Sequence, residues 1–140
     1  MKNIFLLLSI FIISINANEI AFAKNVKGDV FSQLSDKKTN LKNTQWVDEK
    51  SIISTKANSS VTLVFKDTST LVLGENSILS LERFLFKPKT EKYKFELKLS
   101  KGTASFESGK IGKLSPNDFA FKTPESTVAI RGTKFIVNVQ

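Results

Sequence analysis

Apolar and polar residues alternate with a period of two along most of this chain. Val61, Leu63 and Phe65 fall on one side of an extended segment, and the same alternation runs from residue 134 to residue 139. Successive side chains of a β-strand point to opposite faces, so this pattern indicates half-buried strands rather than helices. Strands are therefore predicted at residues 20–25, 29–35, 51–54, 60–66, 69–74, 78–86, 93–100, 102–108, 118–123, 126–131 and 134–139.

Turn-forming residues separate these segments. Runs containing Gly, Pro, Asn, Asp or Ser recur between the predicted strands, and Lys101 with Gly102 separates 93–100 from 102–108. Short strands joined by frequent turns predict an all-β fold, a single compact domain of mostly antiparallel strands arranged as a sandwich or as a short solenoid. The polar stretch 35–50 is predicted to be a loop, with Trp46 folded back as a lid on the core.

The segment 78–86 departs from simple alternation. Large apolar residues crowd around the charged pair Glu82 and Arg83, namely Leu79, Leu81, Phe84, Leu85 and Phe86. A strand covered on both faces is the simpler interpretation. An exposed flank that forms a partner surface is the alternative.

The first residues have the composition of a secretory signal. Lys2 precedes a nearly unbroken apolar run that ends before Ala17, and this run is shorter than the roughly 20 apolar residues of a membrane span. Residues 1–17 are therefore predicted to be a signal peptide, with an uncleaved anchor as the alternative. Cleavage after Ala23 is also possible by composition, but it would remove part of the first strand. The expected location is periplasmic or secreted, with no transmembrane segment after signal cleavage.

The length and charge of the rest of the chain limit its organisation and partners. Residues 18–140 suit one domain, and the absence of cysteine means that no disulfide supports it. The formal net charge of +8 becomes +7 when Lys2 is removed, since residues 1–17 carry no other charge. Because the lysines are spread along the chain, they are read first as a solvated surface, and attraction to an anionic envelope glycan is the alternative. Export argues against nucleic acid as a partner.

The residue types available for catalysis are few. The chain has no His and no Cys, which excludes imidazole bases, thiolate nucleophiles and nearly all zinc sites. Residues 109–113 lack the spacing of a phosphate-binding loop, and no calcium-loop spacing occurs. The carboxylates at predicted turns are expected to be solvated and to bond nearby backbone amides: Asp48, Glu49, Asp67 and Glu75. We therefore predict no enzyme activity, no cofactor and no metal.

The most distinctive stretch is TPESTVAIRGTKFIV, residues 123–137, which predicts two short strands around a glycine corner. It closely resembles the C-terminal signature of the FecR domain. The resemblance continues in chain order through residues 26–30, 52–65, 70–79 and 99–104. The residues of this signature are taken as a structural motif: Thr123, Pro124, Arg131, Gly132, Thr133 and Phe135.

The resemblance implies an exported, non-catalytic module that binds another cell-envelope component, in cell-surface signalling or envelope sensing. In the signalling members of the family, such a domain contacts an outer-membrane receptor. The expected partner here is thus an envelope protein of that kind or an anionic envelope glycan. The alternative is a carbohydrate-binding or adhesive surface module, for which Trp46 and Tyr93 are the candidate binding platforms.

Two features near the signature leave alternatives open. Arg131 is either a binding residue or, as we favour, a structural residue that bonds backbone carbonyls or pairs with Glu125 or Glu107. The strand 134–139 is expected either to pair with an N-terminal strand of its own domain or to form an edge that contacts a partner or a second copy, giving a homo-oligomer. The family commonly has Gly where this chain has Thr68 and where it has residues 47–49, which leaves the types of these turns open.

Overall fold

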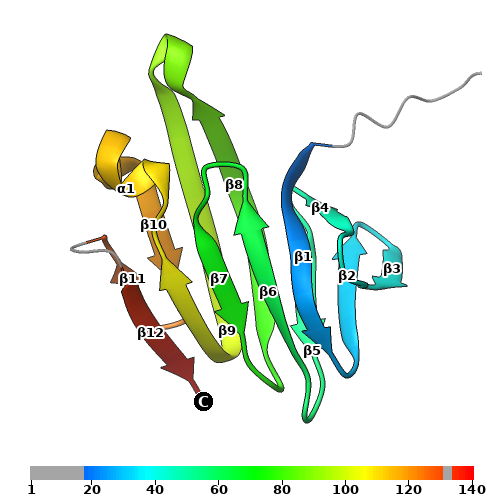
Figure 1. Ribbon diagram of the computed structural model, residues 1–140. Helices are drawn as coiled ribbons and strands as arrows, with labels where there is room; N and C mark the ends of the chain where they lie inside the picture. Colours follow the sequence, from blue (N-terminus) through cyan, green and yellow to red (C-terminus); the bar gives the residue numbers. More distant parts are fainter. Residues whose placement is uncertain (1–17, 131–133) are drawn as a thin grey trace, which may run out of the picture.

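The computed structural model describes residues 18–130 and 134–140, so the signal predicted at 1–17 lies outside the described residues. These residues form an all-β domain in which one sheet curls into a half-barrel (Figure 1). The strands are β1 (Glu19–Lys27), β2 (Val30–Leu34), β3 (Lys37–Asn40), β4 (Trp46–Asp48), β5 (Ile52–Thr55), β6 (Ser60–Phe65), β7 (Thr70–Leu73), β8 (Ile78–Lys87), β9 (Lys92–Glu107), β10 (Phe119–Lys122), β11 (Thr127–Val128) and β12 (Lys134–Val139). Three short helices complete the described chain: η1 (Pro88–Thr90), α1 (Lys110–Leu114) and η2 (Pro116–Asp118).

The long strand β9 belongs to both walls of the half-barrel. Its first half pairs with β8 and β10 in the rear wall, which also contains β5, β2, β3 and β11. Its second half pairs with β7 and β12 in the front wall, which continues through β6 and β1 to β4. All of these pairings are antiparallel except β9 with β10, which is parallel. The prediction of mostly antiparallel strands is confirmed.

Gly102 lies where β9 passes from one wall to the other. Its φ of +94° is a conformation that side chains disfavour, and a Cβ there would collide with the Ser77 side chain. The turn predicted at Lys101 and Gly102 is therefore wrong. The backbone bends at the glycine, but the strand continues, because both halves keep their ladders on either side of the bend.

A β-bulge explains the crowded apolar residues of β8. Leu79 and Leu81 are fully buried opposite β9, the register shifts between Leu81 and Arg83, and Phe84 then faces the core. An extra residue in one strand inverts the alternation that follows it, so large residues on both sides of the bulge reach the same core. The predicted strand covered on both faces is therefore incorrect.

The stretch 35–50 is not the predicted loop, because it contains β3 and β4. Trp46 pairs with Phe22 of β1, and 46% of its surface is exposed. Val47 is buried, and neighbouring residues of a strand point to opposite sides, so Trp46 must face outward. The expected lid on the core is therefore wrong.

Several turns share one construction, a residue with left-handed backbone followed by a buried serine. The pairs are Lys50 with Ser51, Asn58 with Ser59, Thr68 with Ser69, and Asn76 with Ser77. The hydroxyl of Ser59 accepts a hydrogen bond from the Asp29 N–H at 2.9 Å, and that of Ser77 accepts one from the Thr103 N–H at 3.0 Å. Each of these two hydroxyls thereby ties its turn to a segment that is distant in sequence.

Asp67 fixes the turn between β6 and β7 to the start of α1. Its carboxylate accepts hydrogen bonds from the Ser69 N–H at 3.0 Å, the Ser69 hydroxyl at 2.7 Å and the Ile111 N–H at 3.1 Å. Asp67 is 0% exposed, so the expectation that it is solvated is wrong, although it does bond nearby amides as predicted. A buried carboxylate needs such donors because it has lost its water. The helix α1 is not among the elements that the sequence predicts.

Candidate interaction surfaces

The two aromatic residues predicted as binding platforms lie on separate parts of the domain. The ring of Trp46, at the β4 edge of the front wall, meets Phe22 edge-on at 5.4 Å between centroids, and the Lys66 ammonium lies 5.6 Å from the Trp46 ring centroid. Tyr93, near the start of β9, is half-buried and its ring lies 5.6 Å from that of Phe86. No aromatic contact among the described residues joins Trp46 to Tyr93, so they do not form one platform. Their binding roles stay predictions.

The signature residues are divided between a described turn and the corner. Thr123 and Pro124 lie in the turn between β10 and β11, where the Thr123 hydroxyl accepts a hydrogen bond from the Ser126 N–H at 3.0 Å. Phe135 packs on the core, with its ring 5.3 Å from Phe121 and 5.5 Å from Phe106. The remaining members, Arg131, Gly132 and Thr133, fall outside the described residues, and the roles assigned to them stay predictions.

Strand β12 pairs with β9 and not with an N-terminal strand, so that alternative is wrong. Phe135, Val137 and Val139 pack against the core, which confirms the predicted orientation of this strand. Among the described strands, none pairs with the other side of β12. An edge with free backbone groups can accept a further strand.

Apolar side chains also gather on the outer face of the front wall. Val72 of β7 is 44% exposed and Ile136 of β12 is 70% exposed, and both stand opposite Ser105 of β9 in the ladders. Farther along the same wall, Trp46 stands opposite Phe22. We call Val72, Ile136, Phe22 and Trp46 the front-face residues. Exposed apolar groups on one wall are typical of a surface that contacts another macromolecule.

Ion pairs neutralise part of the rear wall. The Lys122 ammonium lies 2.9 Å from a Glu82 carboxylate oxygen, and Glu96 lies within ion-pair distance of both Lys122 and Lys94. Burial alone would raise the pKa of Glu96, but the hydrogen bond from Lys94 and the nearby positive charges lower it. The hydrogen bond to Glu82 raises the pKa of Lys122 against the opposing effect of burial. The positive and negative charges of this cluster therefore largely neutralise one another.

A model of the FecR protein family matches residues 51–140. The chain belongs to the FecR family. This family is regulatory, is associated with cell-surface signalling and with the cell envelope, and is generally non-enzymatic. No curated protein and no solved structure matches the chain.

The family match begins at Ser51, directly after one of the left-handed turn residues. Thr68, where the family resemblance predicts a glycine, has a φ of +71°, and Lys50 has the same value. Both residues therefore hold the backbone conformation that favours glycine. The turn at Thr68 therefore has left-handed geometry without a glycine.

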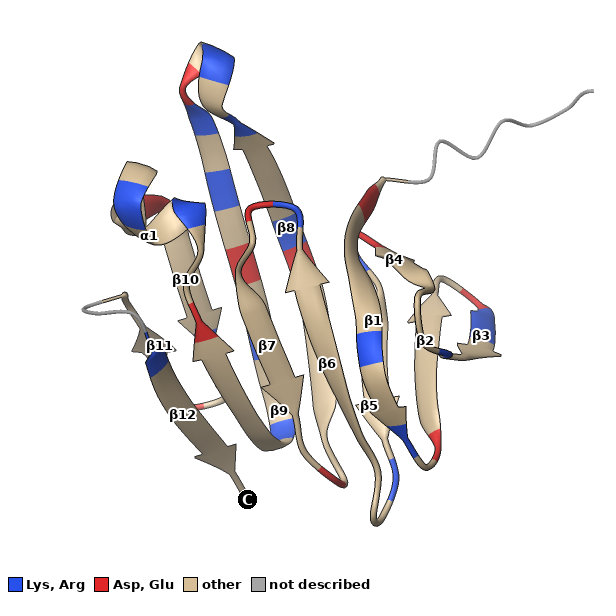
Figure 2. Ribbon diagram, viewed as in Figure 1, with Lys and Arg blue, Asp and Glu red and all other residues tan. Residues whose placement is uncertain are grey.

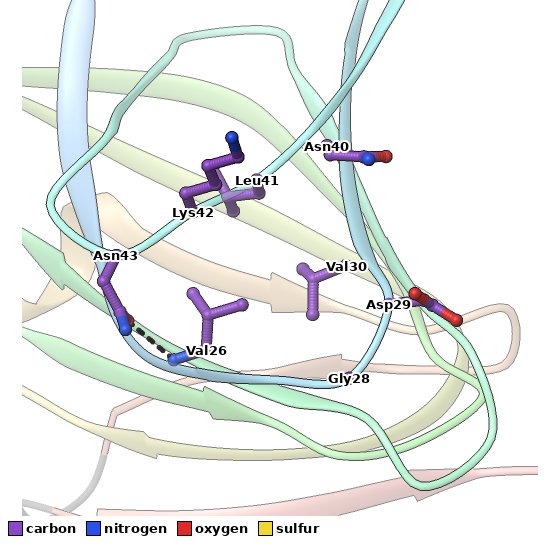
Figure 3. A pocket seen from close by; sticks show the side chains of 8 residues that line it. All are labelled: Val26, Gly28, Asp29, Val30, Asn40, Leu41, Lys42 and Asn43. Atoms are coloured by element: carbon purple, nitrogen blue, oxygen red, sulfur yellow. Dashed lines mark hydrogen bonds between the residues drawn. The ribbon is translucent and has the colours of Figure 1, made fainter.

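A polar hollow of this FecR-family domain lies between the β1–β2 turn and the segment leading to β4 (Figure 3). Val26, Val30 and Leu41 contribute apolar surface, while Asp29 and Lys42 carry its charges. The amide oxygen of Asn43 accepts the Val26 N–H at 2.8 Å, and that of Gln45 accepts the Lys42 N–H at 2.9 Å. These amide oxygens are already bonded within the domain, and no aromatic residue lines the hollow.

Within 18–130 and 134–140, no group of three or more His, Cys, Asp or Glu residues could hold a metal ion. In the same part of the chain, no helix has the length and apolar character needed to cross a membrane.

Proposed function

We propose that this chain is an exported, non-catalytic FecR module that binds an envelope protein, such as an outer-membrane receptor, in cell-surface signalling or envelope sensing. Membership of the FecR family carries the proposal. The front-face residues support it, because exposed Ile136 lies on the edge strand β12, and exposed Val72 lies on the same face two strands away, across β9. A partner there can cover apolar side chains and bond backbone groups at the same time.

Site-specific photo-crosslinking in intact cells tests this binding surface. A photoreactive residue at position 136 or 72 should give a discrete adduct with one envelope protein. Leu114 provides a matched control, because it is an exposed large aliphatic residue on α1 and belongs to neither proposed surface. Absence of an adduct from both front positions, or the same adducts from position 114, would contradict binding at the front wall.

Export and processing are tested separately. N-terminal sequencing of the protein recovered from the periplasm or medium should begin at Asn18. A start at Lys24 would show that β1 loses its first residues on maturation. Recovery of an intact Met1 in the membrane fraction would show that the signal is retained as an anchor.

A carbohydrate-binding or adhesive role is the second candidate, favoured by one observation, the exposure of Trp46. An exposed indole can stack on the apolar face of a sugar ring. A glycan array probed with the parent and with Trp46→Ala tests this role. Glycan binding that the substitution removes would support it, and an empty array would exclude it for the glycans presented.

A further inference from the structure

We propose that the outer face of the rear wall carries a binding site for phosphate-bearing lipid headgroups. The site consists of Lys38, Lys56 and Lys101 around a floor formed by Ile52 and Ile78. It goes beyond the proposed function, which concerns a protein partner on the front wall. The two surfaces are on different walls and can be tested independently.

The site is a hollow to which several strands contribute. The ladders place Ser54 of β5 opposite Ile78 of β8, and Ile78 opposite Lys101 of β9. Toward the β3 edge of the same wall, Ile52 of β5 lies opposite Gln33 of β2. Gln33 in turn lies opposite Lys38 of β3. These residues all line one hollow, so the three lysines surround it from three separate segments.

The charge of this hollow is uncompensated. Every Asp and Glu of the chain is among the described residues, and none lies within ion-pair distance of Lys38, Lys56 or Lys101. Lys94 and Lys122 on the same wall, in contrast, are paired with glutamates. Figure 2 shows positively charged segments on β3 and on the lower part of β9, the strands that contain Lys38 and Lys101.

The surrounding groups leave these lysines free for an anion. Glu75 is beside the lining residue Asn76, but its carboxylate accepts the Asn58 N–H at 2.7 Å. The Lys38 ammonium lies 4.6 Å from the Phe31 ring centroid, a contact that holds its cation over the rear wall. Like charges around one hollow repel each other, and a bound anion removes that repulsion.

The floor of the hollow distinguishes a lipid from a free anion. Ile52 and Ile78 are each 39% exposed, although large apolar residues are usually buried. Inorganic phosphate would leave both side chains in water. The headgroup of a phospholipid brings a phosphate to the lysines and its first methylene groups to the isoleucines. The net charge of +7 without residues 1–17 adds attraction to an anionic membrane surface.

Vesicle co-sedimentation of the purified protein tests the site. The probe is phosphatidylcholine vesicles with and without phosphatidylglycerol. Lys38→Gln/Lys56→Gln/Lys101→Gln should weaken binding to the anionic vesicles about a hundredfold, since each lysine near such a surface contributes roughly a fivefold effect. The matched control is Lys87→Gln/Lys92→Gln/Lys113→Gln, which removes the same charge from exposed positions elsewhere and should retain most of the binding.

Two further measurements complete the test. Ile52→Ser/Ile78→Ser should weaken vesicle binding while all three lysines are retained and the fold, checked by thermal melting, is preserved. Inorganic phosphate should compete only weakly. The proposal is overturned if the anionic vesicles are not bound, if both triple variants weaken binding equally, or if inorganic phosphate competes as well as lipid. None of these outcomes affects crosslinking from position 136, so the proposed protein contact stands or fails separately.

Discussion

Replacing Thr68 with glycine should stabilise the domain. Thr68 is an exposed, β-branched residue with a φ of +71°, between the buried residues Asp67 and Ser69. Its side chain makes no hydrogen bond within the part of the chain that the structure describes. Its backbone N–H bonds the Phe65 carbonyl at 2.9 Å, and glycine keeps that bond. The substitution therefore removes strain without removing a contact.

Two opposing effects set the size of the gain. A left-handed backbone costs an L-residue about 1–2 kcal/mol. Glycine makes the unfolded chain more flexible, which reduces stability by about 0.4–1 kcal/mol. The expected net gain is about 1 kcal/mol in the free energy of unfolding, or a rise in Tm of about 2–5 °C for a domain of this size.

Chemical denaturation and thermal melting measure this gain. Thr68→Ala is the control, because it removes the β-branch but keeps the Cβ that causes the strain, and it should gain less than Thr68→Gly. Lys50→Gly offers a second comparison at the same φ of +71° in an unbranched residue, with a smaller gain expected. Equal stability of the Gly and Ala variants at position 68 would refute the argument from backbone strain.

Other substitutions should have the following effects. Gly102→Ala should cost about 3 kcal/mol or more, because its φ of +94° and the Ser77 side chain both exclude a Cβ; denaturant unfolding measures the loss, and a Ser77→Ala background should recover part of it. Asp67→Asn should cost about 2 kcal/mol, because an amide cannot accept all three hydrogen bonds, and a Tm equal to that of the parent would refute this role. Glu96 has a pKa lowered below 4.5, so its ion pairs stabilise the fold above that pH and the effect is lost as pH falls through the folded-state pKa. Glu96→Gln should therefore reduce Tm at neutral pH, and its difference from the parent should shrink in acid.

The strand positions could be predicted because alternation and turn residues act locally. The segments at 60–66 and 134–139 lie within one residue of β6 and β12. The bend at Gly102 could not be distinguished from a turn, because a glycine with positive φ serves either structure and only the ladders on both sides decide. The bulge of β8 likewise depends on pairing with β9, which local periodicity does not contain.

The candidate surfaces are harder to predict from the sequence than the fold. The sequence predicts Trp46 as a lid on the core, but buried Val47 next to it forces Trp46 outward. Lys38, Lys56 and Lys101 are far apart in sequence, and only the pairing of β3, β2, β5, β8 and β9 brings the segments that carry them to one hollow. Asp67 looked like an ordinary turn residue because its partner Ile111 is distant in the chain.

The position of β9 has a consequence for how the chain folds. Two of its partners, β7 and β8, precede it in the sequence, and two others, β10 and β12, follow it. Neither wall can be completed until β9 is in place. Folding therefore depends on contacts between residues distant in sequence, and we expect it to be slow. Once formed, the walls should also be lost together. A single protease cut within β9 should therefore unfold the whole domain and not only one wall.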